Sequence, residues 1–127
     1  MSIVVSNASP LINLARVGYF DLLVAFYRQI VIPQAVYEEI VVRGEGREGS
    51  REVRAADWVT VQVPQDDLAV RALAAELGTG EASAIVLAQE LGASLLLIDE
   101  IRGRLNKEVL QGRLGDLALR RVFAAFL

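Results

Sequence analysis

Hydrophobic residues along the chain fall into two patterns, short continuous runs and longer segments with helical spacing. The short runs are rich in β-branched residues or leucine and end in polar residues, which is typical of strands. The predicted strands are residues 3–5, 30–32, 58–63 and 95–98. Three of them are apolar throughout, as expected for burial on both faces of a sheet. The strand that begins at Trp58 alternates instead, which predicts a half-exposed position.

The segments between these strands carry the signals of helix starts and ends. Ser9-Pro10 predicts a helix start with Ser9 as the cap, and Gly18 predicts the end of that helix. The glycine-rich, charged residues 43–50 predict a mobile loop. Residues 111–127 lack a clear strand pattern, and we expect one more amphipathic helix there. The other predicted helices are residues 20–27, 33–42, a short piece before residue 58, 66–77, 79–91 and 101–110.

The order of these elements indicates the fold class. Strands that alternate with helices over 127 residues predict an α/β domain with a parallel sheet. The apolar fraction of 54% suffices for a folded core, and the chain has neither internal repeats nor a dividing linker, so we expect residues 1–127 to form one domain. No run reaches about 18 apolar residues. Because the N-terminus also lacks signal-peptide features, we expect a cytoplasmic protein without a membrane segment.

Composition limits the chemistry that the chain can perform. The sequence contains no Cys and no His, which excludes thiolate nucleophiles, imidazole bases and conventional zinc sites. Any metal is therefore expected to be a hard cation with oxygen ligands, such as Mg²⁺ or Mn²⁺. The net charge of −3 argues against a surface that coats polyanions, although metal ions can offset charge locally in a nucleic-acid enzyme.

Candidate ligands for such a cation follow from the predicted sheet. In an open α/β sheet, ligands bind outside the carboxyl ends of the strands. Asn7 and Asp99 directly follow the two most deeply buried predicted strands, so we expect both at the same edge. Glu39, in the helix after the second strand, and Glu81, at the start of the helix that precedes the last strand, can join them. A carboxylate cluster is costly unless cations neutralise it, which predicts a divalent-metal site.

Each of these residues also has a purely structural explanation. Asn7 suits the turn after a strand, and Ser9 suits a helix cap. Glu81 gains from the dipole at a helix N-terminus, and Asp99 could cap the helix that follows it. Glu38 and Glu39 lie in the later half of their helix, where the dipole disfavours negative charge, and one of them is expected on a solvated face. The glycine-rich loop lacks the Gly-Lys-Ser/Thr ending of a phosphate-binding loop, which argues against nucleotide binding there. Its arginines could meet phosphate or be solvated.

Five segments of the chain resemble the PIN-domain family. They are VVSNASPLINLARVG, VIPQAVYEEIVVRG, WVTVQV, LGTGEASAIVLAQELGASLLLIDE and IRGR. Together they cover roughly residues 2–106 in family-like order, and they are similar to a bacterial and archaeal branch that includes the toxin ribonucleases of toxin–antitoxin pairs. The resemblance implies a PIN-like three-layer α/β/α sandwich with a mainly parallel central sheet of four to five strands.

The resemblance also implies a site and an activity. The metal-binding positions of the family fall on Asn7, Glu39, Glu81 and Asp99, and the three acids among them are the implied catalytic residues. Ser9 and Arg102 are implied to support the site or contact the substrate. Family members typically hydrolyse RNA with Mg²⁺ or Mn²⁺, so the implied activity is that of a metal-dependent, toxin-like endoribonuclease. The implied partners are RNA and an antitoxin protein. The apolar fraction of 54% also suggests surface that is buried in a dimer of the chain or against an antitoxin.

Two departures from the family pattern keep an alternative open. The usual first acid is Asp, whereas Asn7 offers an oxygen without negative charge, which should lower affinity for the ion. Residues 107–127 lack the convincing final strand of the family and form an atypical C-terminal segment. The alternative is a catalytically weak PIN-like module that binds RNA or a partner protein without cleavage. A third candidate is a small-molecule-binding α/β domain, which a large apolar pocket away from the acids would support.

Overall fold

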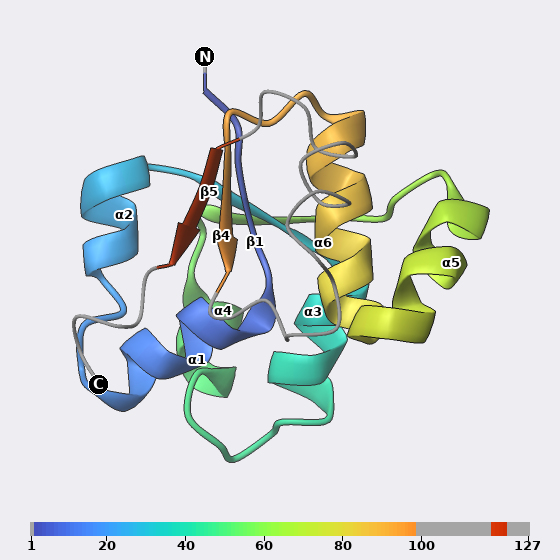
Figure 1. Ribbon diagram of the computed structural model, residues 1–127. Coiled ribbons are helices and arrows are strands. Elements are labelled where there is room, and N and C mark those ends of the chain that lie inside the picture. The colour runs from blue at the N-terminus through green and yellow to red at the C-terminus, as the bar shows by residue number, and fades with distance from the viewer. Residues whose placement is uncertain (1, 99–117, 122–127) are drawn as a thin grey trace.

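The strands form one parallel sheet in the computed structural model, which describes residues 2–98 and the backbone of residues 118–121. The sheet has five strands in the order β3-β2-β1-β4-β5, and every neighbouring pair is parallel (Figure 1). The parallel α/β class expected from the sequence is therefore confirmed. The strands are β1 (Val4–Ser6), β2 (Ile30–Pro33), β3 (Val59–Gln62), β4 (Leu95–Ile98) and β5 (Ala118–Arg121).

Helices connect the strands in the described part of the chain. Most lie within one or two residues of their predicted bounds, and α5 begins after Asp66, whose side chain accepts a hydrogen bond from the Ala69 N–H at 3.0 Å. The α-helices are α1 (Ala8–Arg16), α2 (Leu22–Tyr27), α3 (Gln34–Tyr37), α4 (Ser50–Ala55), α5 (Asp67–Leu77) and α6 (Thr79–Glu90). A π-helical turn, η1 (Glu38–Val42), continues α3.

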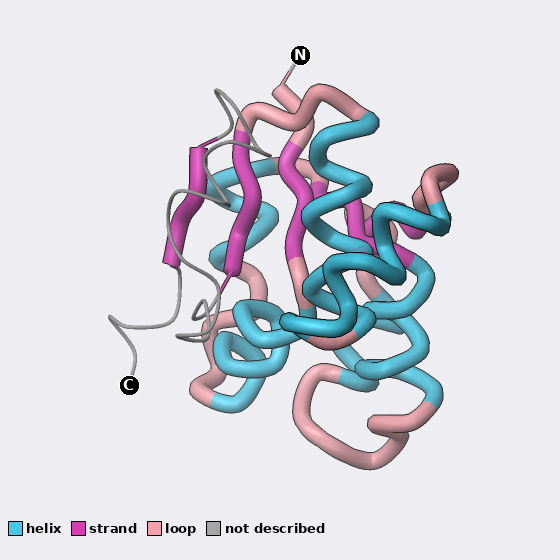
Figure 2. Tube along the Cα trace, turned by 45° about the vertical axis from the view of Figure 1, so that its right-hand side comes forward, coloured by secondary structure: helices cyan, strands magenta, loops and turns pink. Residues whose placement is uncertain are grey.

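The central strands bury alternate residues on opposite faces of the sheet, as strand geometry requires. Val4 and Leu97 pack in one core with residues of α1, α2 and α4. Val5 and Leu96 pack on the opposite face, chiefly with α6. Figures 1 and 2 show α5 and α6 on one side of the sheet and α1 and α2 on the other. This arrangement is the expected three-layer α/β/α sandwich, with β1 at its centre.

The parallel register brings the carboxyl ends of β1, β2 and β4 to one edge of the sheet. Val5 pairs with Val31 of β2, and Ser6 pairs with Leu97 of β4. Helices α1 and α6 both begin at this edge, and α3 lies beside them (Figure 1). Residues that follow β1 or begin α6 therefore meet there.

The start of α1 differs from the prediction. The helix begins at Ala8 with Asn7 as its N-cap residue, so the prediction that Ser9 caps the helix is wrong. Ser9 and Pro10 lie in the first turn instead. Proline is tolerated there because backbone N–H groups of the first turn have no intrahelical partner.

Residues 33–42, predicted as one helix, divide into α3 and η1. In η1 the Arg43 N–H donates to the Glu38 carbonyl at 2.8 Å, which is the five-residue spacing of a π-turn. Gly44 comes soon after η1 and lies very close to the backbone of that turn. A Cβ atom on residue 44 would lie only 2.5 Å from the Ile40 carbonyl oxygen. Apolar spacing does not reveal a π-turn, because a single wide turn leaves the pattern on either side helical.

Strand β5 corrects the expectation for the C-terminal segment. Residues 118–121 pair with Leu95 to Ile98 along the whole of β4, so the predicted helix over 111–127 is wrong for these residues. The Ala-Leu-Arg-Arg sequence lacks β-branched and aromatic residues, so its local preference for a strand is weak. The strand forms because its backbone groups find hydrogen-bond partners along the open edge of β4. The predicted helix over 101–110 lies outside the described residues.

None of the helices in the described residues is both long enough and apolar enough to cross a bilayer.

Candidate functional site

A cavity of about 240 Å³ lies at the edge of the sheet where α1 and α6 begin. It brings together four of the six residues singled out in the sequence, from the end of β1, the start of α1, the π-turn and the start of α6. The lining residues are Asn7, Ala8, Ser9, Glu39, Leu77, Gly78, Thr79, Gly80 and Glu81.

Asn7 is the most deeply buried polar residue of this cavity. The residue is 3% exposed, and its backbone N–H donates to the Leu97 carbonyl oxygen at 3.2 Å. Its side-chain Oδ1 is also buried and has no hydrogen-bond partner among the described residues. An unsatisfied buried acceptor costs about 1–3 kcal/mol. A ligand that accepts the lone pairs of Oδ1 would remove this cost, and a hard cation is such a ligand.

Glu39 reaches the cavity from the π-turn. The residue is exposed, and its Oε1 atom lies 2.9 Å from the point that a Cβ atom on Gly80 would occupy. The carboxylate therefore lies over the first turn of α6, where the helix dipole favours negative charge. Its neighbour Glu38 does not line the cavity; it accepts a hydrogen bond from the Gln34 side chain at 3.4 Å.

Glu81 lies one residue beyond Gly80 in the first turn of α6 and is half-buried. Ala84, Ile85 and Ala88, which follow on the same helix, are buried in the core. Ser9 lines the cavity from the first turn of α1 and is also half-buried. The rigid starts of two helices thus set the positions of one carboxylate and one hydroxyl.

The donors in this cavity fit a hard divalent cation. They comprise the Asn7 amide oxygen, the carboxylates of Glu39 and Glu81, and the hydroxyls of Ser9 and Thr79, and Mg²⁺ and Mn²⁺ prefer oxygen ligands of these kinds. The residues that the structure describes contain no group of three acids close enough together to hold a metal ion.

Two of the predicted site residues cannot be placed in the cavity. Asp99 is the next residue in the chain after Ile98, which ends β4, and Arg102 follows three positions later. Both lie outside the described residues.

Sequence reasoning missed two neighbours of these acids. Thr79 and Gly80 line the cavity, yet only Glu81 of the Thr79-Gly80-Glu81 sequence was predicted as a site residue. A glycine in the first turn of an otherwise regular helix was the available signal, since Gly lowers helix stability unless packing requires it.

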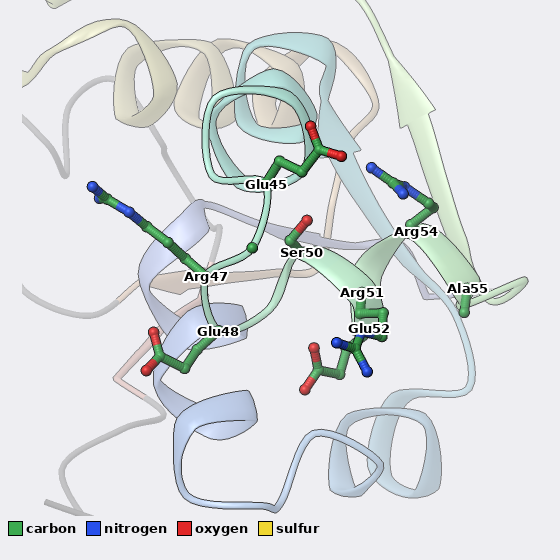
Figure 3. A pocket seen from close by; sticks show the side chains of 9 residues that line it. Glu45, Arg47, Glu48, Ser50, Arg51, Glu52, Arg54 and Ala55 are labelled. Atoms are coloured by element: carbon green, nitrogen blue, oxygen red, sulfur yellow. The ribbon is translucent and has the colours of Figure 1, made fainter.

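A larger cleft of about 770 Å³ lies between the loop over residues 43–49 and α4. Six of its nine lining residues are charged, three Glu and three Arg, so it is not the large apolar pocket that a small-molecule-binding domain would require. Figure 3 shows the Arg47 side chain extending away from the other lining residues. The lining residues are Glu45, Gly46, Arg47, Glu48, Ser50, Arg51, Glu52, Arg54 and Ala55.

Comparisons with known proteins identify the family. Residues 3–111 match a family model described as a PIN domain, which is most of the chain and includes all six predicted site residues. No curated protein and no solved structure gives a significant match. The family match agrees with the parallel α/β sheet and with the segments that suggested the resemblance. The chain belongs to the PIN domain family.

Proposed function

We propose that the protein is a divalent-metal-dependent endoribonuclease of the toxin-like kind. The single observation that carries this proposal is the orphaned Oδ1 atom of Asn7, buried in the same cavity as Glu39 and Glu81. The orphaned acceptor costs free energy that a bound cation would remove, and the carboxylates of Glu39 and Glu81 in the same cavity are ligands that such a cation prefers. Membership of the PIN domain family, whose fold is of a nuclease type and whose members typically use divalent metals, supports the same function.

The chain's own residues would then have distinct roles. Asn7, Glu39, Glu81 and Asp99 would hold the ion or ions, and Ser9 and Arg102 would contact or support the substrate. The bound metal would supply an activated water and stabilise charge on the phosphate oxygens. The protein needs no side-chain base for this chemistry, which suits a chain without His.

Asn7 itself favours a second candidate function. An amide oxygen brings no negative charge, so a site that contains Asn7 binds a cation less tightly than a site with Asp at this position. A catalytically weak module that binds RNA or a partner protein without cleaving it would be compatible with that loss of charge.

We also propose that the protein pairs with an antitoxin protein and with a second copy of itself. Partners of this kind follow from the resemblance to toxin ribonucleases, and exposed apolar side chains on opposite sides of the sheet offer contact points for them: Phe26 on α2 is 74% exposed and Leu68 on α5 is 77% exposed. Light scattering of the purified protein distinguishes a dimer from a monomer, and a strictly monomeric protein would contradict the second half of this proposal.

The enzyme and the binding module differ in two measurements. If the protein is a nuclease, we expect it to cleave members of a panel of structured RNAs in Mn²⁺, and we expect its Tm to increase when Mn²⁺ is added. Glu81→Ala and Asp99→Ala are expected to abolish cleavage while circular dichroism remains that of the folded protein. Binding of RNA without cleavage by the wild-type protein would favour the module, and undiminished cleavage by both variants would exclude this site.

A further inference from the structure

We infer that Gly80 is a positioning residue for Glu39: the absence of a side chain at Gly80 gives the Glu39 carboxylate its place over the first turn of α6. The inference rests on the proposed function for its consequence in metal binding, while the contact between the two residues stands on geometry alone. Neither the sequence pattern nor the family match assigns a role to this glycine.

Backbone conformation does not explain the glycine. Gly80 lies within α6 and does not have the positive φ that favours glycine, unlike Gly78 two residues earlier, which has φ +95°. Alanine at a helical position is more favourable than glycine. The glycine at this position therefore lowers helix stability without any conformational need.

The limited space around residue 80 explains the glycine instead. A Cβ atom on Gly80 would lie 3.6 Å from a methyl group of Val36, which is ordinary contact, but 2.9 Å from Oε1 of Glu39. The carboxylate would have to move by about 0.5 Å to reach ordinary contact at 3.4 Å. Oε1 is the far end of a flexible side chain, so the metal-free protein accommodates this shift at small cost, whereas a carboxylate that must also meet a metal ion at a distance defined to about 0.2 Å has fewer positions to move to.

The π-turn η1 fixes the backbone position of Glu39. It is closed by the hydrogen bond from the Arg43 N–H to the Glu38 carbonyl, and π-turns occur frequently at functional sites. The backbone of Glu39 is thus held by η1 and its carboxylate is accommodated by Gly80. Two elements far apart in the sequence together determine where this carboxylate lies.

The test combines metal binding with a double-mutant cycle in the metal-free protein. Gly80→Ala is expected to weaken Mn²⁺ binding about tenfold by calorimetric titration, a loss comparable to that of groups that orient metal ligands. In the metal-free protein, Gly80→Ala in a Glu39→Ala background is expected to raise Tm by about 2–4 °C, because only the helix preference remains. With Glu39 present, the same change is expected to raise Tm less or to lower it.

A conservative variant tests for rescue. Glu39→Asp shortens the side chain by one methylene and so removes the overlap with the added Cβ atom; in the Glu39→Asp background, Gly80→Ala is therefore expected to raise the Tm of the metal-free protein about as much as in the Glu39→Ala background. The inference is overturned if Gly80→Ala raises Tm as much with Glu39 present as in the Glu39→Ala background and leaves Mn²⁺ affinity unchanged. A wild-type protein that binds no Mn²⁺ contradicts the proposed function instead, and the Tm cycle then still decides whether Gly80 accommodates Glu39.

Discussion

The backbone N–H of Asn7 donates a hydrogen bond to the carbonyl oxygen of Leu97 at 3.2 Å. This bond extends the pairing of β1 with β4 by one residue beyond Ser6, so the main chain of Asn7 is held by the sheet. The side chain is left to face the cavity with an unsatisfied Oδ1 atom. A central strand thus presents one oxygen ligand rigidly beside Leu97, which lies two residues before Asp99 in the chain.

Asn7→Asp is expected to tighten Mn²⁺ binding about tenfold, equivalent to about 1.4 kcal/mol, because a carboxylate adds negative charge at an existing ligand position. Without metal, the same variant is expected to be less stable by about 1–3 kcal/mol, since a charged acceptor is buried without a partner. Calorimetric titration and thermal melts with and without Mn²⁺ measure both effects. Unchanged affinity would mean that Asn7 is not a ligand.

Gly44→Ala is expected to destabilise the protein by about 1–3 kcal/mol, which is typical of overpacking. The added Cβ atom would lie 2.5 Å from the Ile40 carbonyl oxygen and 2.8 Å from that of Glu39, and these backbone atoms cannot move without opening the π-turn. Gly46→Asn is the comparison in the same loop: Gly46 has open space around it, and among side chains Asn bears the strain of its φ of +84° best, so a smaller loss is expected there. Urea unfolding that gives equal losses for both variants would contradict this account of Gly44.

Glu90→Ala is expected to lower the free energy of unfolding by about 1–2 kcal/mol. The Glu90 carboxylate, at the end of α6, accepts hydrogen bonds from the Gln65 N–H at 2.9 Å and from the Asp66 N–H at 2.8 Å, which joins α6 to the start of α5. Arg71→Ala is the comparison, since it removes only the exposed pair of Arg71 with Asp67, worth at most about 0.5 kcal/mol. Chemical denaturation in which Arg71→Ala is the more damaging change would refute the prediction.

The elements that could be predicted from the sequence are those in which local pattern and tertiary packing agree. The apolar runs of β1 and β4 are buried between two helical layers, and the alternating residues of β3 are half-exposed. Asn7, Glu39 and Glu81 were also expected at one edge of the sheet, because parallel strands end at the same side, and all three line one cavity there.

The features that escaped prediction depend on contacts between distant segments. Strand β5 forms where β4 offers an open edge, although its own residues favour strands only weakly. The π-turn and the glycine in the first turn of α6 contribute to the site because the Glu39 carboxylate lies close to Gly80. This contact joins two distant segments, and no local sequence pattern predicts it. Helix α1 starts at Ala8 and not after Ser9: the extended backbone that follows β1 ends at Asn7, which is hydrogen-bonded to Leu97 and is the N-cap residue.

The acids that line the cavity are proposed to hold a catalytic divalent cation, and the adjacent Glu38 and Glu39 allow a direct test of this proposal. Cleavage of one structured RNA panel should be measured for the wild-type protein, Glu39→Gln and Glu38→Gln, each in Mn²⁺ and in EDTA. Glu38 precedes Glu39 in the chain but does not line the cavity. We predict cleavage by the wild-type protein and by Glu38→Gln in Mn²⁺ alone, with a loss of at least about tenfold in Glu39→Gln. Cleavage in EDTA, or equal activity of the two variants in Mn²⁺, would contradict the claim.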